Sequence, residues 1–495
     1  MTDATAEVVP LTKAATAHER RWWILAVLAI SQLMVVLDGT IVNIALPTAQ
    51  HSLNFSNSDR QWIVTAYSLA FGSLLLLGGR VSDYIGRKNA LIVGLVGFAG
   101  ASALGAASMN FTMLVVARTV QGAFGALLAP SVLALLTTTF RDPDERGRAF
   151  GIYGSVSGAG AALGLLLGGI LTSYLSWRWT LLVNLIFAAI GIVGAVVLLH
   201  HDRGADHDPL NWTGVLTSTG GLFALVYGFS HAETTSWSDT YTIGSLVVAT
   251  ILLVSFITIQ KRTHFPLLPL RVLLDRNRGG ALAAMLVAGS GMFGVFLFLT
   301  YYLQVTLAYS AVMTGMAFLP MVVGIGITAQ LSNIVLMPRL GPRPLIPLGM
   351  LIAAASLLWL TRLGIHSSYL TDIVGPTVTM GFGIGLIFAP GFNTATLGVA
   401  NHDAGVASAL VNTAQQIGGS IGIALLNTLA AATAANFLVR RNPTRLNLEL
   451  AGVHSYTSAF AYSAWIFIGG AVLTGLLLRS GAPEPSEGEA LVMTH

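Results

Sequence analysis

Long apolar runs separated by short polar turns follow one another along nearly the whole chain. A helix needs about 20 mostly apolar residues to cross the roughly 30 Å hydrocarbon core of a bilayer. Since lipid offers no partner for backbone N–H and C=O groups, such runs are expected to be helical. The pattern predicts an all-α integral membrane protein with 14 transmembrane helices, at Trp22–Leu46, Gln61–Gly79, Ala90–Ala107, Met113–Phe140, Phe150–Leu175, Trp179–Leu199, Trp212–Phe229, Thr242–Ile259, Ala281–Ala308, Met313–Met337, Leu345–Leu360, Leu370–Val399, Val406–Phe437 and Ser458–Leu478.

The composition excludes a soluble protein. Charged residues make up 9% of the chain and hydrophobic residues 54%, with a mean hydropathy of +0.74, whereas soluble domains carry about 25% charged residues. The chain contains no cysteine, which excludes disulfides and thiolate metal sites. Its 11 histidines all fall in tails, loops or span ends, which argues against a buried haem.

The basic residues predict the orientation in the membrane. With the N-terminus in the cytoplasm, 18 of the 25 Lys and Arg residues lie on the cytoplasmic side, six lie outside, and Arg118 lies within a span. This excess follows the positive-inside rule and predicts that both termini are cytoplasmic. The basic residues are scattered through short loops and form no patch, so nucleic acid is not expected as a partner.

A weak internal sequence repeat indicates two related halves. The loop after the second span reads GGRVSDYIGRKN and the loop after the tenth reads MPRLGPRPL. We therefore expect two six-helix halves, at 22–200 and 261–479, with two inserted helices at 201–260 and cytoplasmic tails at 1–21 and 480–495. Between the eighth and ninth spans, PLLPLRVLLD predicts a short interfacial helix.

Asp38 and Arg118 are the charged residues that lie deep within predicted spans. Each costs at least about 2.5–3.5 kcal/mol at the centre of a membrane helix, and the helical rise places both at a similar depth. They are expected to pair or to share a water-filled cavity. One interpretation is structural, with the pair only holding the bundle together. The other is that Asp38 takes up and releases protons as its surroundings change.

Several neutral side chains within the spans are candidates for a substrate cavity. Amides could line such a cavity or merely bridge helices, and aromatic rings in spans are commonly packing residues. The candidates are Asn43, Tyr67, Gln121, Tyr153, Gln304, Asn393, Asn412 and Gln415.

Four motifs in order give the chain a resemblance to a known family. The loop Gly79–Lys88 fits the pattern G-x-x-x-D-[RK]-x-G-[RK]-[RK], with Tyr84 in place of one basic residue. The others are LDGTIVNIALP from Leu37 to Pro47, R-x-x-Q-G at Arg118, and a glycine motif in the fifth span in which Leu165 replaces proline. The chain resembles the major facilitator superfamily, and within it the fourteen-span drug:proton antiporters of the EmrB/QacA type.

The resemblance implies export from the cytoplasm by alternating access, driven by proton entry across a bacterial inner membrane, with no enzyme activity and no cofactor. Asp38 would be the proton-coupling acid and Arg118 its modulator. The substrate would be a small amphipathic molecule, neutral or monocationic rather than dicationic because Asp38 is the only deep acid, and the chain would act as a monomer. The implied inner gate is Gly79, Asp83, Gly86, Arg87 and Lys88, with Asp83 capping the thirteenth span, and the implied antiporter motif is Gly160, Gly164, Gly168 and Gly169.

Three alternatives remain open from the sequence. The same fold could serve as a dedicated exporter or flippase for one lipid or secondary metabolite. It could instead carry out proton-coupled uptake, which the motif of the fifth span disfavours. A membrane enzyme or a non-transporting sensor has no support, because the sequence holds no G-x-x-x-x-G-K-[ST] loop and no metal-ligand cluster.

Overall fold

The computed structural model describes residues 11–140, 142–200, 210–439, 441–442 and 444–481. Within these ranges the regular elements are all helical. The long helices are α1 (Leu11–Leu53), α2 (Asn57–Ile85), α3 (Arg87–Ala106), α4 (Phe111–Thr139), α5 (Pro143–Tyr174), α6 (Trp179–Leu198), α7 (Trp212–Thr234), α8 (Thr240–Arg262), α10 (Arg276–Tyr301), α12 (Leu319–Leu331), α14 (Pro342–Leu360), α15 (Val374–Thr396), α16 (Ala404–Leu438) and α17 (Arg445–Leu477). The short elements are α9 (Leu270–Leu274), α11 (Ala311–Ala317), α13 (Met337–Leu340), the π-helical turns η1 (Tyr302–Thr306), η2 (Ser332–Leu336) and η3 (Tyr369–Ile373), and the 3₁₀ turn η4 (Asn401–Asp403).

Thirteen helices within the described residues are long and apolar enough to cross a membrane. Each coincides with a predicted span, which confirms the all-helical membrane fold. The remaining prediction, Trp212–Phe229, coincides with α7, which is a 23-residue helix but is not among the thirteen. The predicted tail 1–21 is helical from Leu11 onward, as part of α1, while residues 1–10 and 482–495 lie outside the described residues.

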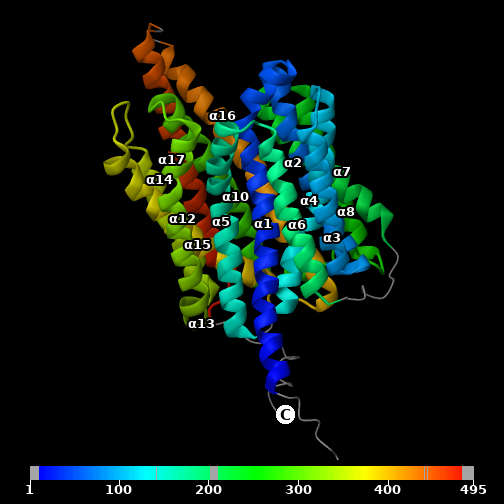
Figure 1. Ribbon diagram of the computed structural model, residues 1–495. Coiled ribbons are helices and arrows are strands. Elements are labelled where there is room, and N and C mark those ends of the chain that lie inside the picture. The colour runs from blue at the N-terminus through cyan, green and yellow to red at the C-terminus, as the bar shows by residue number, and fades with distance from the viewer. Residues whose placement is uncertain (1–10, 141, 201–209, 440, 443, 482–495) are drawn as a thin grey trace, which may run out of the picture.

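The helices fall into two groups by their mutual contacts. In the first group, α1 packs against α5 and α6, and α4 packs against α2 and α3; in the second, α10 and α14 pack against α15 and α17, and α10 also packs against α16. Figure 1 shows the helices running along a common axis, with the start of α1 and the end of α17 at the same end of the bundle. We call this the terminal end, and the opposite one the far end. The proposed domain boundaries stay a prediction.

Helix α5 is the main link between the two groups. It packs against α1 on one side and against α11, α12 and α15 on the other. Helices α2 and α4 also contact α16 of the second group. Helix α7 lies against both α2 and α16, and α8 lies against α7 at the edge of the bundle (Figure 1).

Two turns at the terminal end share an unusual backbone. Gly86 between α2 and α3 has φ 87°, and Gly341 between α13 and α14 has φ 73°. Residues with a side chain rarely adopt this left-handed region, so glycine is required at both turns. These are the two loops whose sequences resemble each other, and the structure gives them the same reversal of direction.

Basic side chains cap helix ends around these two turns. Arg20 donates from Nε and Nη2 to the carbonyls of the last two residues of α6, at 3.0 and 2.8 Å. Arg276 donates in the same way to the last two residues of α17, at 2.7 and 2.6 Å. Lys88 and Arg343, each two residues after its turn glycine, donate to carbonyls near the ends of α6 and α17. Cations at helix C-termini are favourable because the last carbonyls are unsatisfied and the dipole is negative there.

Candidate functional site

Asp38 on α1 and Arg118 on α4 form an ion pair deep in the first group. Arg118 Nη1 lies 2.6 Å from Asp38 Oδ2, and both side chains are almost completely buried. The guanidinium group also lies over the ring of Tyr67 on α2, with Cζ 4.3 Å from the ring centroid. The two charges that the sequence placed at a similar depth are therefore in direct contact.

Neutral polar groups complete the surroundings of the Asp38 carboxylate. Gln121 Nε2 and Asn184 Nδ2 donate to Asp38 Oδ1 at 2.7 and 2.8 Å. Gln121 Oε1 in turn accepts from Arg118 Nη1 at 2.5 Å, and Ser102 Oγ accepts from Gln121 at 2.8 Å. We call Asp38, Ser102, Arg118, Gln121 and Asn184 the deep network. Since the three groups around the carboxylate are donors, their arrangement suits its ionised form.

The glycines of the fifth span bring α5 close to the stretch of α1 that carries Asp38. A Cβ atom at Gly160 would lie 2.6 Å from the Val36 side chain, and one at Gly164 would overlap the Thr40 hydroxyl. At Gly168 it would lie 2.9 Å from a carbonyl of α1. Small residues of this kind allow the closest approach of membrane helices. Leu165 is buried, and α5 continues unbroken through it.

A second glycine face on α5 points towards the other group. Cβ atoms at Gly151 and Gly154 would meet α12 and α15, at 2.7 Å from Gln330 Oε1 and 2.8 Å from the Ala389 backbone. A Cβ atom at Gly169 would lie 2.9 Å from the start of α11. Helix α5 therefore contacts Asp38's helix and the second group through separate small-residue faces.

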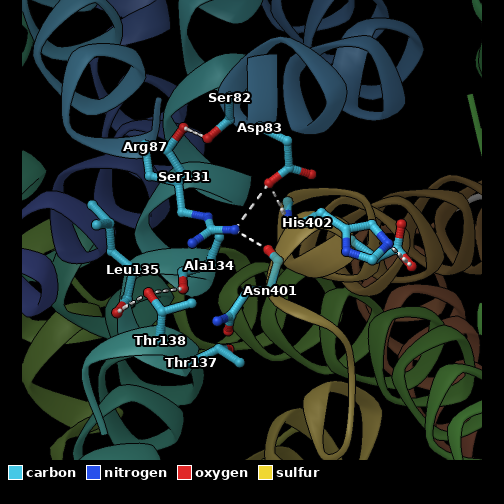
Figure 2. Close-up of polar contacts among 12 residues, drawn as sticks. Ser82, Asp83, Arg87, Ser131, Ala134, Leu135, Thr137, Thr138, Asn401 and His402 are labelled. Carbon is cyan, nitrogen blue, oxygen red and sulfur yellow. Dashed lines mark hydrogen bonds and ion pairs between the residues drawn. The ribbon is translucent and has the colours of Figure 1, made fainter. Parts of the chain in front are cut away.

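At the terminal end, α2 is bound to the start of α16. Asp83 Oδ1 accepts from the backbone N–H of Gly405 at 3.1 Å and from Arg87 Nη2 at 3.4 Å, and Arg87 also donates to the carbonyl of Asn401 (Figure 2). We call Asp83, Arg87, Asn401 and Gly405 the gate cluster. A carboxylate is favourable at the N-terminus of a helix, where N–H groups are unsatisfied. The predicted cap on the thirteenth span is therefore present.

The other residues of the same loop support the gate cluster. A Cβ atom at Gly79 would lie 2.6 Å from both the Ala409 side chain and the Gly405 carbonyl, so only glycine lets α2 approach α16 this closely. Gly86 makes the turn, and Lys88 binds the end of α6 rather than the second group. Beside the cluster, the buried hydroxyls of Ser82 on α2 and Ser131 on α4 are hydrogen bonded at 2.9 Å (Figure 2).

Arg146 forms a second contact between the groups at this end, and the sequence analysis missed it. The predicted fifth span begins at Phe150 and leaves Arg146 in a loop, whereas α5 begins at Pro143 and buries Arg146 in its first turn. Its Nε donates to Asn393 Oδ1 at 2.8 Å, and its Nη2 donates to Thr396 Oγ1 at 2.9 Å, both on α15. The polar sequence PDERGR gave no signal that this arginine is buried.

The candidate cavity residues of the first group are spread over three places. Tyr67 and Gln121 belong to the surroundings of Asp38. Tyr153 on α5 is fully buried, and its ring packs edge-on against Phe392 of α15, with centroids 5.0 Å apart. Asn43 is exposed on α1.

The candidates of the second group do not join them. Asn393 binds Arg146 at the terminal end, and Asn412 donates to the Ser408 carbonyl of its own helix. Gln304 lies in the π-helical turn η1 and is partly exposed, as is Gln415 on α16. The contacts of these residues do not join them into one site, and their role in a substrate cavity stays a prediction. Asn184 and Ser102 do belong to the deep network. The sequence places Asn184 within a span, as an amide that could line a cavity or bridge helices, whereas Ser102 gives no signal because isolated hydroxyls occur throughout the spans.

Comparison with known proteins gives consistent relationships. The sequence model of the protein family described as Major Facilitator Superfamily matches residues 28–423 of this chain. The chain is 46% identical over 476 residues to the puromycin resistance protein pur8 of Streptomyces alboniger, covering 95% of this chain and 94% of that protein. It is 36% identical over 407 residues to the cephamycin export protein CmcT of Amycolatopsis lactamdurans, covering 80% and 82%. The solved structure of the human organic anion transporter MFSD10 matches with a TM-score of 0.61 at 16% identity, covering 92% of this chain and 99% of that one, a likeness of fold alone.

Proposed function

This chain belongs to the Major Facilitator Superfamily and is a multi-pass membrane transporter rather than an enzyme, and on that premise we propose that it exports an amphipathic antibiotic or related natural product from a bacterial cytoplasm in exchange for protons. The observation that carries the direction of transport is its similarity, over most of both chains, to proteins named for antibiotic resistance and export. The observation that supports proton coupling is the ion-paired carboxylate of Asp38, deep in the first group.

The deep network supports a proton-exchange step with a simple charge balance. Asp38 is 0% exposed and its carboxylate contacts the Arg118 guanidinium group, so a proton reaches it only when the helices rearrange. A proton arriving from the outside would neutralise Asp38 and remove its ion pair, leaving Arg118 with its contact to Gln121. Release of that proton to the cytoplasm would restore the pair. One proton would thus cross the membrane per cycle, and the opposite movement of substrate would use its energy.

The gate cluster supports alternating access. Asp83 and Arg87 join α2 to α16, and Arg146 joins α5 to α15, all at the terminal end. We take this end as cytoplasmic because of the excess of basic residues in its loops. The described conformation would then be closed to the cytoplasm, and separation of these contacts would admit substrate. A single chain holds both the deep network and the gate, which fits a functional monomer.

The test is reconstitution of the purified chain in proteoliposomes with an imposed pH gradient. We expect transport of puromycin against its concentration gradient, coupled to proton movement in the opposite direction and collapsed by a protonophore. Flux in the same direction as the protons would indicate uptake and contradict the proposal, as would transport that is indifferent to the gradient.

A dedicated exporter of one compound is the second candidate. Both relatives carry the name of a single antibiotic class, which favours a narrow substrate range. A panel containing puromycin, a cephamycin and an unrelated quaternary ammonium dye separates the two possibilities. Transport of one member alone indicates a dedicated exporter, and transport of the dye as well indicates a multidrug exporter.

A further inference from the structure

The two helices inserted between the groups contact one helix of each group. Helix α7 packs against α2 and α16, and the hydroxyls of Thr65 on α2 and Ser230 on α7 lie 3.2 Å apart. Helix α8 packs mainly on α7, and only 17% of its most apolar window is buried inside the protein, so its other faces meet lipid. Helix α7 therefore lies against both helices of the α2–α16 contact, and α8 is packed on α7.

Polar contacts connect this pair to α16 at both ends. At the far end, Trp237 in the turn between α7 and α8 donates from Nε1 to Thr428 Oγ1 at 2.7 Å. At the terminal end, Arg271 on α9 lies with Nη2 2.6 Å from Asp403 Oδ2. Since Arg271 lies nine residues after the end of α8 at Arg262, both contacts belong to one continuous segment of chain.

The segment between α8 and α10, residues 263–275, contains α9 and is itself held in place; we call it the strap. Gln260 at the end of α8 accepts a hydrogen bond from the backbone N–H of Leu268 at 3.2 Å. Leu267, Leu268 and Val272 are each at most 3% exposed. With Leu267, Leu268 and Val272 buried, the strap carries Arg271 to a position beside α16.

Arg271 acts on the same helical turn as the gate cluster. Asp403 stands at the N-cap of α16, two residues before Gly405, whose N–H binds Asp83, and two after Asn401, whose carbonyl binds Arg87. Asp403 is 3% exposed on its side chain, with Arg271 and the ring of His402 against it. Figure 2 shows how closely Asn401 and His402 lie to Arg87 and Asp83.

We propose that α7, α8 and the strap form a lateral clamp that holds α16 against α2 and favours the closed terminal end, with Arg271 as a positioning residue that acts through Asp403. The inserted helices thereby take part in gating without touching the substrate. The inference rests on the alternation of open and closed states in the proposed function, but not on the identity of the substrate.

The absence of cysteine allows a direct test. Ser408→Cys places one thiol on α16 at a fully buried position, one turn beyond Gly405. The full-length reporter is reconstituted in proteoliposomes, and its reaction with a membrane-impermeant maleimide is followed from the terminal-end side. We expect Arg271→Gln and Asp403→Asn each to raise this rate about two- to fivefold, as expected for the loss of a partly exposed ion pair, and Arg271→Lys to restore it.

Arg276→Gln is the matched control, because the guanidinium group of this neighbouring arginine donates to the last carbonyls of α17. An unchanged rate in both Arg271→Gln and Asp403→Asn overturns the proposal, and so does an equal rise in Arg276→Gln or a reporter that stays unreactive in every variant. Because the readout needs no substrate, failure of export in the reconstituted wild-type chain would count against the proposed function and leave this result to be judged separately.

Discussion

The two groups of helices cap their last helix in the same way but differ in charge elsewhere. Arg20 and Arg276 bind the final carbonyls of α6 and α17 through the same guanidinium atoms. Eighteen residues further along the respective helices, the first group has Asp38 and the second has Gly294. Where the first turn has Asp83 three residues before its glycine, the second has Pro338.

This comparison distinguishes the features that both groups share from the acids that occur in the first group alone. The capping residues and the left-handed turn glycines occur twice, so they belong to the shared frame of a six-helix group. The carboxylate of the deep network and the acid of the gate cluster occur once, in the first group. The second group contributes mainly backbone groups to the gate cluster, namely the Gly405 N–H and the Asn401 carbonyl. In the proposed function, the first group would therefore supply the acids for proton exchange and gating, and the second group would supply the surface that they contact.

The largest effect is expected from Asp38→Asn. An amide cannot carry the proton, so pH-driven export should fall to the level of protein-free vesicles. Exchange of substrate across the membrane without a pH gradient should persist, because the side chain keeps its size and an acceptor oxygen. Asp372→Asn is the matched control in the second group, where the carboxylate accepts from the Ser368 N–H. It should keep most of the export rate, and undiminished export by Asp38→Asn would refute the coupling role.

The second-largest effect is expected from replacement of Arg118, and its size should depend on the residue that replaces it. Arg118→Ala leaves the Asp38 carboxylate buried without its cation, which is expected to lower the free energy of unfolding by about 3–5 kcal/mol and to abolish export. Arg118→Lys keeps the charge, but a compact ammonium group lacks the planar face that the guanidinium group lays over the Tyr67 ring. We expect partial export and an intermediate melting temperature in detergent. Wild-type stability of Arg118→Ala would show that the pair contributes little.

The sequence predicts the membrane fold and the pairing of Asp38 with Arg118 for physical reasons. The same reasons explain why it does not predict other buried polar contacts. A charge inside an apolar run, such as Asp38, is costly in lipid and therefore conspicuous. Burial of Arg146 depends on α15 packing against the first turn of α5, and a polar first turn cannot be distinguished from a loop by hydropathy. Asn184 meets Asp38 only through tertiary packing of α6 on α1. The proximity of Arg271 to Asp403 joins residues 132 positions apart and leaves no local pattern.

The gate should respond more moderately than the deep network. With the Ser408→Cys reporter, Asp83→Asn is expected to raise maleimide reactivity from the terminal-end side by roughly tenfold, because a hydrogen bond to a charged group contributes about 1.5–3 kcal/mol. Pro338→Ala, at the corresponding position of the second group, should leave the rate unchanged. Similar rates in Asp83→Asn and the unaltered reporter would mean that the contact does not hold the closed state.

The smallest effects are expected where the two groups are alike. Arg20→Gln and Arg276→Gln each remove a cation from the end of a helix whose last carbonyls it binds, and such contacts contribute about 0.3–1 kcal/mol. Both variants should therefore lose a similar, small amount of thermal stability in detergent and keep most of their pH-driven export, measured in the same vesicles. If Arg20→Gln alone abolished export, the capping residues would belong to the transport machinery of the first group. Equal losses would instead assign them to the common frame, and the functional asymmetry would rest on the acids alone.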